Sequence, residues 1–172
     1  MDREAALAGF EAARAEWEAA YAKVPDEALT YLKPGDDYSL GGLEVHVNWV
    51  LAHYLRVLEG AVVAQDPPLS EDARDGLTAQ QRREYLAEMA QLHDGVTATV
   101  TGLDDSAWER LTPVVYGPGQ EPYLTSPEAV MGWLIDHYRE HVQQCGDLTE
   151  EWSALVGQTS GQTSGQTSDS PD

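Results

Sequence analysis

The sequence predicts an all-α protein: a four-helix bundle with a long connection between helices 3 and 4 and a disordered C-terminal tail. Three observations lead to this prediction. Four segments repeat apolar residues at the three- and four-residue steps of an amphipathic helix. No run alternates at period two for long enough to form a strand. The chain has 172 residues, 42% of them apolar, which suffices for one domain with a buried core.

The first two helices are predicted over about residues 3–24 and 40–63. The first ends at Pro25, after which residues 26–29 form a short turn. Ser39 is the expected N-cap of the second. The apolar face of the second helix consists of Leu43, His46, Val47, Val50, Leu51, Tyr54, Val57 and Leu58.

A third helix is predicted from Thr78 to about Leu103, after a stretch that paired prolines and a glycine keep from being helical. The spacing from Thr78 to Gln81 matches a capping box. Residues 104–125 then form a connection much longer than the roughly two to eight residues usual in bundles, with a helical turn expected at residues 106–111. Such a connection is either a crossover or a cover over one end of the bundle.

The fourth helix opens at Ser126 and Pro127, an N-cap followed by proline at the first helical position. Whether it restarts at Gly146 is open. Residues 157–168 repeat GQTS three times and DSPD follows, so nothing there can bury apolar area. We therefore expect a bundle domain over residues 1–156 and a flexible tail over residues 157–172.

Charge and cysteine content limit the classes of function. Thirty acidic residues against ten basic ones give a net charge of −20, which disfavours nucleic-acid and membrane-surface binding and indicates a solvated acidic surface. The single cysteine excludes an internal disulfide. The N-terminus lacks the order of a signal peptide, and no stretch is apolar for the length of a membrane span. We expect a cytoplasmic protein.

Three histidines are predicted to meet inside the bundle. His137 and His141 are four residues apart and share one helical face, which is the apolar one. His46 lies on the apolar face of the second helix. Buried imidazoles need partners, and neutral imidazole binds zinc, nickel, copper or iron(II). His46, His137 and His141 are therefore the predicted metal ligands, zinc or nickel the favoured ion, and hydrogen-bonded core histidines the alternative. Three ligands leave a coordination position open.

The remaining candidates have weaker support. His53 lies two turns from His46, which predicts a core or supporting residue rather than a ligand. His93 is expected at the boundary of the core. Cys145 follows His141 by one turn and is a fourth ligand, a reactive thiol or, most often for cysteine, an apolar filler.

The fourth helix also spells His-Tyr-Arg-Glu-His, the inverted zinc-protease pattern with Glu140 as base. Such proteases need a further carboxylate ligand well downstream, and little ordered chain follows. We interpret Glu140 as a solvent-side charge.

In three segments the chain resembles the DinB-like (DinB/YfiT-like) superfamily of metalloenzymes. One is Tyr38-Ser39 ahead of His46, where the family usually has tryptophan-serine. The second is the histidine pair followed by Gln144, and the third is the turn at residues 24–29. The likeness spans about residues 3–150.

This resemblance implies a four-helix bundle with a three-histidine metal site at one end, and it leaves a homodimer open. Several branches of the family transfer or isomerise thiol adducts, so it also implies a metal-dependent thiol S-transferase or isomerase with a low-molecular-weight thiol and an electrophile as partners. A metal-dependent hydrolase using activated water and a non-catalytic, stress-related metal-binding bundle are the alternatives.

No catalytic residue is assigned from the sequence. Asp136, Tyr54 and Gln144 are candidates to orient a ligand or handle a proton, and only Tyr54 and Gln144 lie close to the inward face. Tyr116 and Tyr123 are placed where the long connection could shape the mouth of the site.

Overall fold

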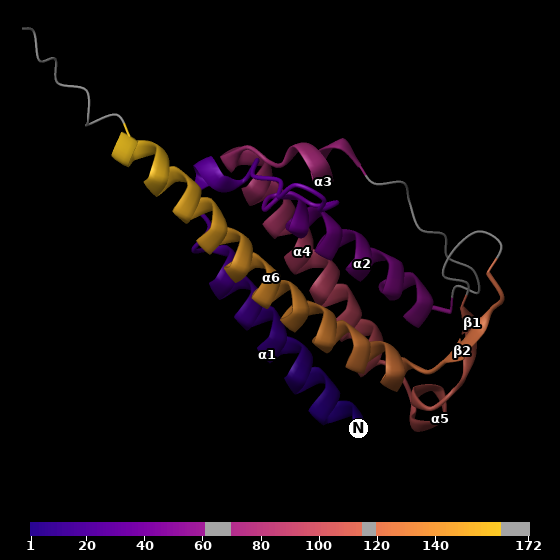
Figure 1. Cartoon of the computed structure of the whole chain (residues 1–172). Helices are drawn as coiled ribbons and strands as arrows, with labels where there is room; N and C mark the ends of the chain where they lie inside the picture. Colours follow the sequence, from indigo (N-terminus) through magenta and orange to yellow (C-terminus); the bar gives the residue numbers. More distant parts are fainter. Residues whose placement is uncertain (61–69, 115–119, 163–172) are drawn as a thin grey trace, which may run out of the picture.

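Four long helices form the body of the computed structural model, which describes residues 1–60, 70–114 and 120–162 (Figure 1). They are α1 (Arg3–Tyr21), α2 (Gly42–Leu58), α4 (Ala79–Thr101) and α6 (Pro127–Gln162). The predicted four-helix bundle is thus confirmed. In the part of the chain that the structure describes, no helix combines the length and the apolar character of a membrane span.

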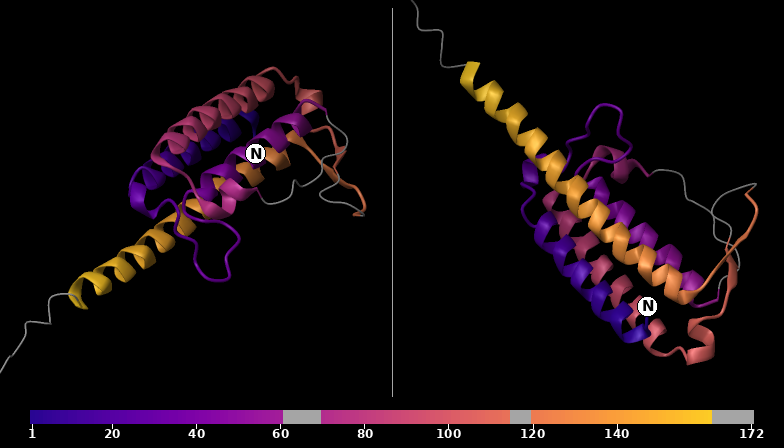
Figure 2. Two further views of the ribbon diagram at one scale, coloured as in Figure 1. Left: turned by 90° about the horizontal axis from the view of Figure 1, so that it is seen from above. Right: turned by 60° about the horizontal axis from the view of Figure 1, so that its bottom comes forward.

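The helices pair in two parallel sets. α1 and α6 run side by side in one direction, because the ring of Phe10 contacts Tyr138 and, further along both helices, Trp17 contacts His141. α2 and α4 run together in the other direction (Figure 2). The order around the bundle is therefore α1, α6, α2, α4.

This topology decides which connection crosses the bundle. Since α2 and α4 run in the same direction, the chain between them must return to the end at which α2 begins. The short helix α3 (Glu71–Asp75) packs there, where the backbone N–H of Ser39 donates to the carbonyl of Ala73 at 3.0 Å.

The connection after α4 is a cover, one of the two options that the sequence left open. Arg3 donates to the carbonyl of Leu103 at the end of α4, and the N-terminal amine pairs with Glu128 at the start of α6. Both ends therefore lie beside the start of α1. The predicted helical turn is present as α5 (Asp105–Trp108).

Two strands in this connection were not predicted. β1 (Thr112–Val114) pairs antiparallel with β2 (Tyr123–Thr125), with Thr112 opposite Thr125. The prediction that no strand forms was wrong because each strand has three residues, too few for a period of two to be recognised.

Two of the predicted helix starts agree with the structure. Thr78 and Gln81 form the capping box of α4, and the Ser126 hydroxyl accepts from the N–H of Ala129 in α6. The prediction that Ser39 is the N-cap of the second helix was wrong, because α2 begins at Gly42 with Gly41 as its N-cap. The Ser39 hydroxyl still accepts from the N–H of Gly42 at 3.0 Å and so satisfies a free donor in the first turn of α2.

Several boundaries differ from the prediction. α1 ends at Tyr21, followed by a 3₁₀ turn over Asp26–Ala28, and α2 ends at Leu58. α6 passes Gly146 without a break and continues to Gln162, six residues into the predicted tail. Residues 61–69 and 163–172 lie outside the described residues.

The core contains a histidine that the sequence placed at its boundary. His93 in α4 is 1% exposed, because its ring stacks on Phe10 at 3.9 Å and 9°. Its Nε2–H donates to the Glu11 carboxylate at 3.0 Å, and Glu11 itself is exposed, so the polar end of the buried ring is satisfied by a surface side chain. The largest fully buried side chains of the core are Trp17, Tyr21, Tyr138, Phe10, Leu29, Leu40, Leu43, Leu51, Leu77, Met89, Met131 and Leu134.

Candidate metal centre

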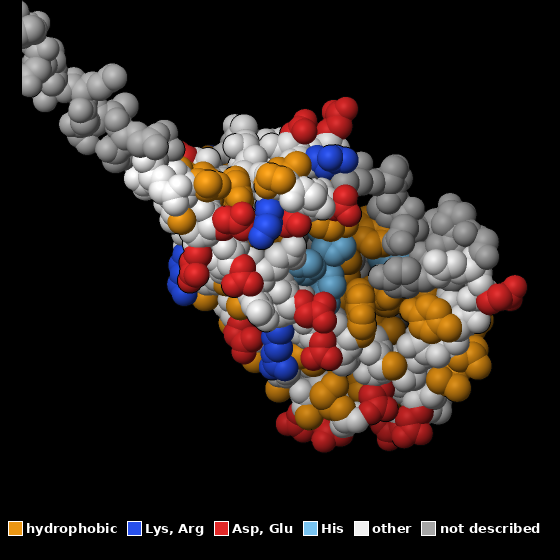
Figure 3. Space-filling view, viewed as in Figure 1, with side chains coloured by type: hydrophobic (Ala, Val, Ile, Leu, Met, Phe, Trp, Pro, Cys, Tyr) orange, Lys and Arg blue, Asp and Glu red, His pale blue; other side chains and the backbone are white. Residues whose placement is uncertain are grey.

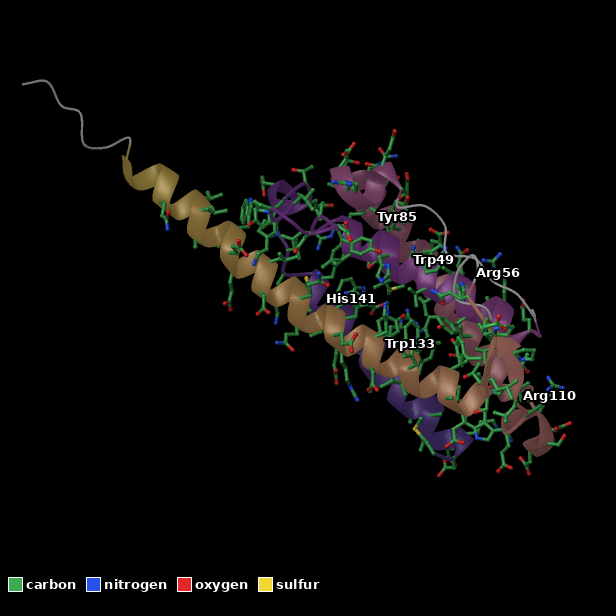
Figure 4. The ribbon with its side chains drawn as sticks, turned by 45° about the vertical axis from the view of Figure 1, so that its right-hand side comes forward. Trp49, Arg56, Tyr85, Arg110, Trp133 and His141 are labelled. Carbon is green, nitrogen blue, oxygen red and sulfur yellow. The ribbon has the colours of Figure 1, made fainter. Side chains whose placement is uncertain are left out.

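The three predicted ligands come from two helices that lie against each other. His46 is in the second turn of α2, and His137 and His141 occupy consecutive turns of α6. α2 and α6 are antiparallel, so the start of α2 meets the middle of α6, as the view of the side chains shows (Figure 4). The helical four-residue spacing turns both α6 histidines toward α2.

Their ring nitrogens converge on one point. Nε2 of His137 lies 3.0 Å from Nε2 of His46 and 3.0 Å from Nε2 of His141. Tetrahedral ligands at about 2.0–2.1 Å from zinc are separated by about 3.3 Å, so a small outward shift fits an ion. Within the described residues, these three form the one group of three or more His, Cys, Asp or Glu side chains with ligand atoms this close, all within 4.8 Å.

Gln144 determines which nitrogen of His141 carries the proton. Its amide oxygen accepts from Nδ1–H of His141 at 2.8 Å, so the Nε2 lone pair of His141 faces the other two rings. The Nε2 atom of a neutral His137 carries at most one proton, so it can donate to only one of its two neighbours at a time. The two short Nε2···Nε2 contacts therefore share one proton, whereas a cation would bind the lone pairs of all three Nε2 atoms.

All three imidazoles are held in the neutral form that binds metal. Burial, together with the smaller effect of the neighbouring imidazoles, lowers the pKa of His46 to about 4 and that of His137 to about 2. Burial also lowers the pKa of His141, against the hydrogen bond to Gln144. Near pH 7 all three imidazoles are uncharged, so none has to lose a net proton to bind a metal ion, and the shared Nε2 proton only has to move to the other ring nitrogen.

Aromatic rings fix the orientation of these imidazoles. The indole of Trp133 lies 5.1 Å from the ring of His137 at 30°, and the ring of Tyr38 lies 4.5 Å from that of His46. Tyr38 thereby stands beside the site at the position where the family usually has tryptophan. His46 and His141 are half-buried, and histidine side chains reach the surface between hydrophobic ones on this face (Figure 3).

His53 and Cys145 do not join the three histidines. His53 is fully buried, and its ring lies 5.1 Å from Trp49 and 4.7 Å from Tyr54, so it is a core residue. Cys145 is 1% exposed, and burial raises the pKa of its thiol to about 11. The thiol is therefore protonated, and Cys145 serves as apolar filler.

Most of the other candidate residues are exposed, and one packs on a ring beside the site. Asp136 and Glu140 are exposed on the outer side of α6. Tyr54 packs on Trp133 at 4.6 Å. Tyr123 is exposed in β2, and Tyr116 lies outside the described residues.

Sequence reasoning missed two residues beside the site. Trp133 precedes His137 by one turn, so the four-residue spacing of the histidines could have identified it.

Glu44 is fully buried and accepts from the Trp17 indole N–H at 2.7 Å, and burial raises its pKa to about 7. Glu44 stands between apolar neighbours in α2, which was the signal that it faces inward.

The comparisons with known proteins agree with this architecture. The sequence profile of the DinB superfamily matches residues 9–145. YfiT from Bacillus subtilis superposes with a TM-score of 0.69 at 17% identity, over 88% of this chain and 87% of YfiT. That protein is described as "a probable metal-dependent hydrolase with an unusual four-helix bundle topology".

A second solved structure has the same fold. A conserved protein from Enterococcus faecalis superposes with a TM-score of 0.60 at 14% identity, over 86% of this chain and 96% of that protein. No curated protein matches the chain. At these identities the two structures support the fold.

Proposed function

Because this chain belongs to the DinB superfamily, we propose that it is a metal-dependent enzyme whose His46, His137 and His141 hold one divalent ion, zinc or nickel. We further propose that it transfers or isomerises adducts of a low-molecular-weight thiol. The small-molecule thiol and an electrophile are then its partners.

One observation carries the proposal: three Nε2 atoms meet, with contacts of 3.0 Å from His137 to each of the other two. Buried polar groups are normally hydrogen-bonded, and this cluster has one proton for two contacts. A divalent ion resolves that mismatch and neutral imidazole suits it.

The chain's own residues prepare the site for such an ion. Gln144 holds the tautomer of His141, and the rings of Trp133 and Tyr38 hold the imidazoles of His137 and His46 in place. Three protein ligands would leave a coordination position open for a thiol or water. When bound, a divalent ion supplies a Lewis acid that lowers the pKa of a thiol and holds the thiolate for attack.

The surroundings favour a thiol over water as the nucleophile. In the described part of the chain the group of possible metal ligands contains no Asp or Glu, and the nearby Glu44 carboxylate already accepts a hydrogen bond from the Trp17 indole N–H. A bound water molecule would therefore have no carboxylate among the ligands to act as its base. A thiol needs less help, because its pKa of about 8.5 is already close to neutrality. In the reaction the thiol loses its proton, sulfur forms a bond to carbon, and the leaving group departs with the bonding electrons.

A metal-dependent hydrolase is the second candidate. It is supported by the description of YfiT, whose fold this chain shares. In that case the open position takes water, and the thiol has no role.

The two candidates differ in their need for a thiol. Zinc- or nickel-loaded protein is assayed with 1-chloro-2,4-dinitrobenzene in the presence and absence of N-acetylcysteine, and with 4-nitrophenyl acetate alone. We expect turnover of the aryl chloride that depends on the thiol and is lost in His46→Ala. The matched control is His93→Gln, which changes a buried histidine outside the site and should keep the activity.

Hydrolysis of the ester without thiol, lost in His46→Ala, would support the hydrolase instead. Equal rates in wild type and His46→Ala for both substrates would remove both candidates.

A further inference from the structure

We propose that the substrate of this site carries a flat, uncharged apolar group close to the atom that reaches the metal, and that Trp133 forms the surface on which this group stacks. The inference rests on the proposed function, since it names the substrate class for the same site. The evidence is a chain of aromatic rings, the exposure of Trp133 and the charge of the protein.

The rings form a continuous wall from α2 to the predicted ligands. Trp49 contacts His53 at 5.1 Å, His53 contacts Tyr54 at 4.7 Å, and Tyr54 contacts Trp133 at 4.6 Å. Trp133 then stacks on His137 at 5.1 Å. Each separation lies within the range of favourable ring pairs, about 4.5–7 Å between centroids.

Trp133 is the most exposed ring of this wall, since Trp49 is half-buried. Trp133 is 37% exposed, whereas Tyr54 is 4% exposed and His53 is fully buried. The other four tryptophans of the chain are buried or half-buried. A ligand that covers this apolar surface of the indole removes it from water, which makes the binding free energy more favourable.

The geometry places a bound group within reach of the indole. Trp133, His137 and His141 follow at four-residue steps on α6 and face α2 together, and Figure 4 shows Trp133 and His141 on this side. An ion would lie about 2 Å beyond the imidazole nitrogen of His137. A ring one or two bonds from the coordinating atom would therefore lie at stacking distance from Trp133.

The charge of the protein indicates that this group carries no negative charge. The protein carries −20, and acidic side chains lie on the same face as the histidines (Figure 3). Such a field repels anions from the mouth of the site.

Ligand binding to cobalt(II)-loaded protein tests this inference without an activity assay. Benzyl mercaptan and ethanethiol are titrated against wild type, Trp133→Ala and Trp133→Leu, and the thiolate-to-cobalt absorption in the near ultraviolet gives each dissociation constant. We expect the Trp133 variants to lose about ten-fold in affinity for benzyl mercaptan, the size of about 1.4 kcal/mol, and less than about two-fold for ethanethiol. Trp133→Phe should keep most of the preference.

Trp152→Ala is the matched control, because Trp152 is half-buried on the same helix about 28 Å further along. It should change neither constant. Trp133→Leu keeps an apolar side chain, so the comparison holds if Trp133→Ala does not fold.

The outcomes separate this inference from the proposed function. A wild-type protein that takes up no cobalt overturns the proposed function and this inference with it. Cobalt uptake with an equal loss for both thiols in the Trp133 variants overturns this inference alone. Tighter binding of 4-(mercaptomethyl)benzoate than of benzyl mercaptan would overturn the statement that the group is uncharged.

Discussion

Gln144 orients His141, one of the three predicted metal ligands. By accepting the Nδ1 proton of His141 at 2.8 Å, it leaves the Nε2 lone pair directed at His46 and His137. Residues that orient a ligand imidazole in this way commonly contribute about 10–100-fold to metal affinity.

We therefore expect Gln144→Ala to weaken zinc binding by about 10–100-fold, measured by competition with a chelator of known affinity. Gln143→Ala is the control, since Gln143 is exposed on the neighbouring position of the helix. Equal affinity in wild type and Gln144→Ala would show that the amide does not orient His141.

His93 leads to a prediction about pH. Burial lowers its pKa below the unfolded value, so the unfolded chain binds more protons when the pH lies between the two values. Its contribution to stability is complete above about pH 6.5 and is lost as the pH falls below that value. The same direction holds for the three predicted ligands in metal-free protein.

His93→Gln should consequently reduce the slope of unfolding free energy against pH between 6.5 and 5.5. The reduction is at most about 1.4 kcal/mol per pH unit, the value for one proton. Urea unfolding of metal-free protein across that range measures it. An unchanged slope would mean that His93 is protonated to the same extent in the folded and unfolded chain.

Single residues could be predicted from the sequence where helical spacing determines their position, and not where contacts with distant residues determine it. His46, His137 and His141 were identified because helical spacing alone puts them on inward faces. His93 was misplaced because its burial depends on Phe10 and Glu11 of α1, which are distant in sequence.

At the scale of elements, the contact between α2 and α3 leaves no space for a side chain at Gly42. A Cβ there would lie 1.8 Å from the carbonyl oxygen of Ala73. The same region contains the Ser39 hydrogen bonds that hold the start of α2, one turn before His46.

Gly42→Ala should therefore destabilise the protein by more than about 2 kcal/mol, because backbone must move to admit the methyl group. Gly132→Ala is the matched control: its Cβ, in the second turn of α6, would meet nothing within 4 Å, so a gain of up to about 1 kcal/mol is expected. Chemical denaturation measures both. A Gly42→Ala variant as stable as wild type would contradict the close packing of α3 on α2.

Elements were predictable where a local signal marks them. The capping box at Thr78 and the helix start at Ser126-Pro127 each depend on residues that are close in sequence, and both helices begin as expected. The strand pair and α3 have three and five residues, and they form through pairing and packing with distant segments. No periodicity within such short runs could have indicated them.

At the scale of the whole molecule, the net charge of −20 acts against the compact fold. Few acidic groups have a basic partner, since the sequence contains thirty acidic and ten basic residues. We expect the urea midpoint of the metal-free protein to rise between 0.05 M and 0.5 M sodium chloride as salt screens this repulsion. A midpoint that falls would show that the ion pairs present outweigh the repulsion.

The arrangement of the helices was not available from the sequence. Four amphipathic faces predict a bundle, but they do not state which helices are neighbours or which connection crosses. The parallel pairs α1–α6 and α2–α4 follow from long-range contacts, and they place the start of α2 against the middle of α6. That placement is what brings His46 to His137 and His141.

The most direct test of the metal site is the metal content of protein purified without a histidine tag, compared between wild type and His137→Ala. Mass spectrometry of the metals should find about one equivalent of zinc or nickel in the wild type and almost none in the variant, with circular dichroism showing that both are folded. A wild type that holds no transition metal, even after incubation with zinc or nickel, would contradict the account. The three imidazoles would then be core residues that share one proton.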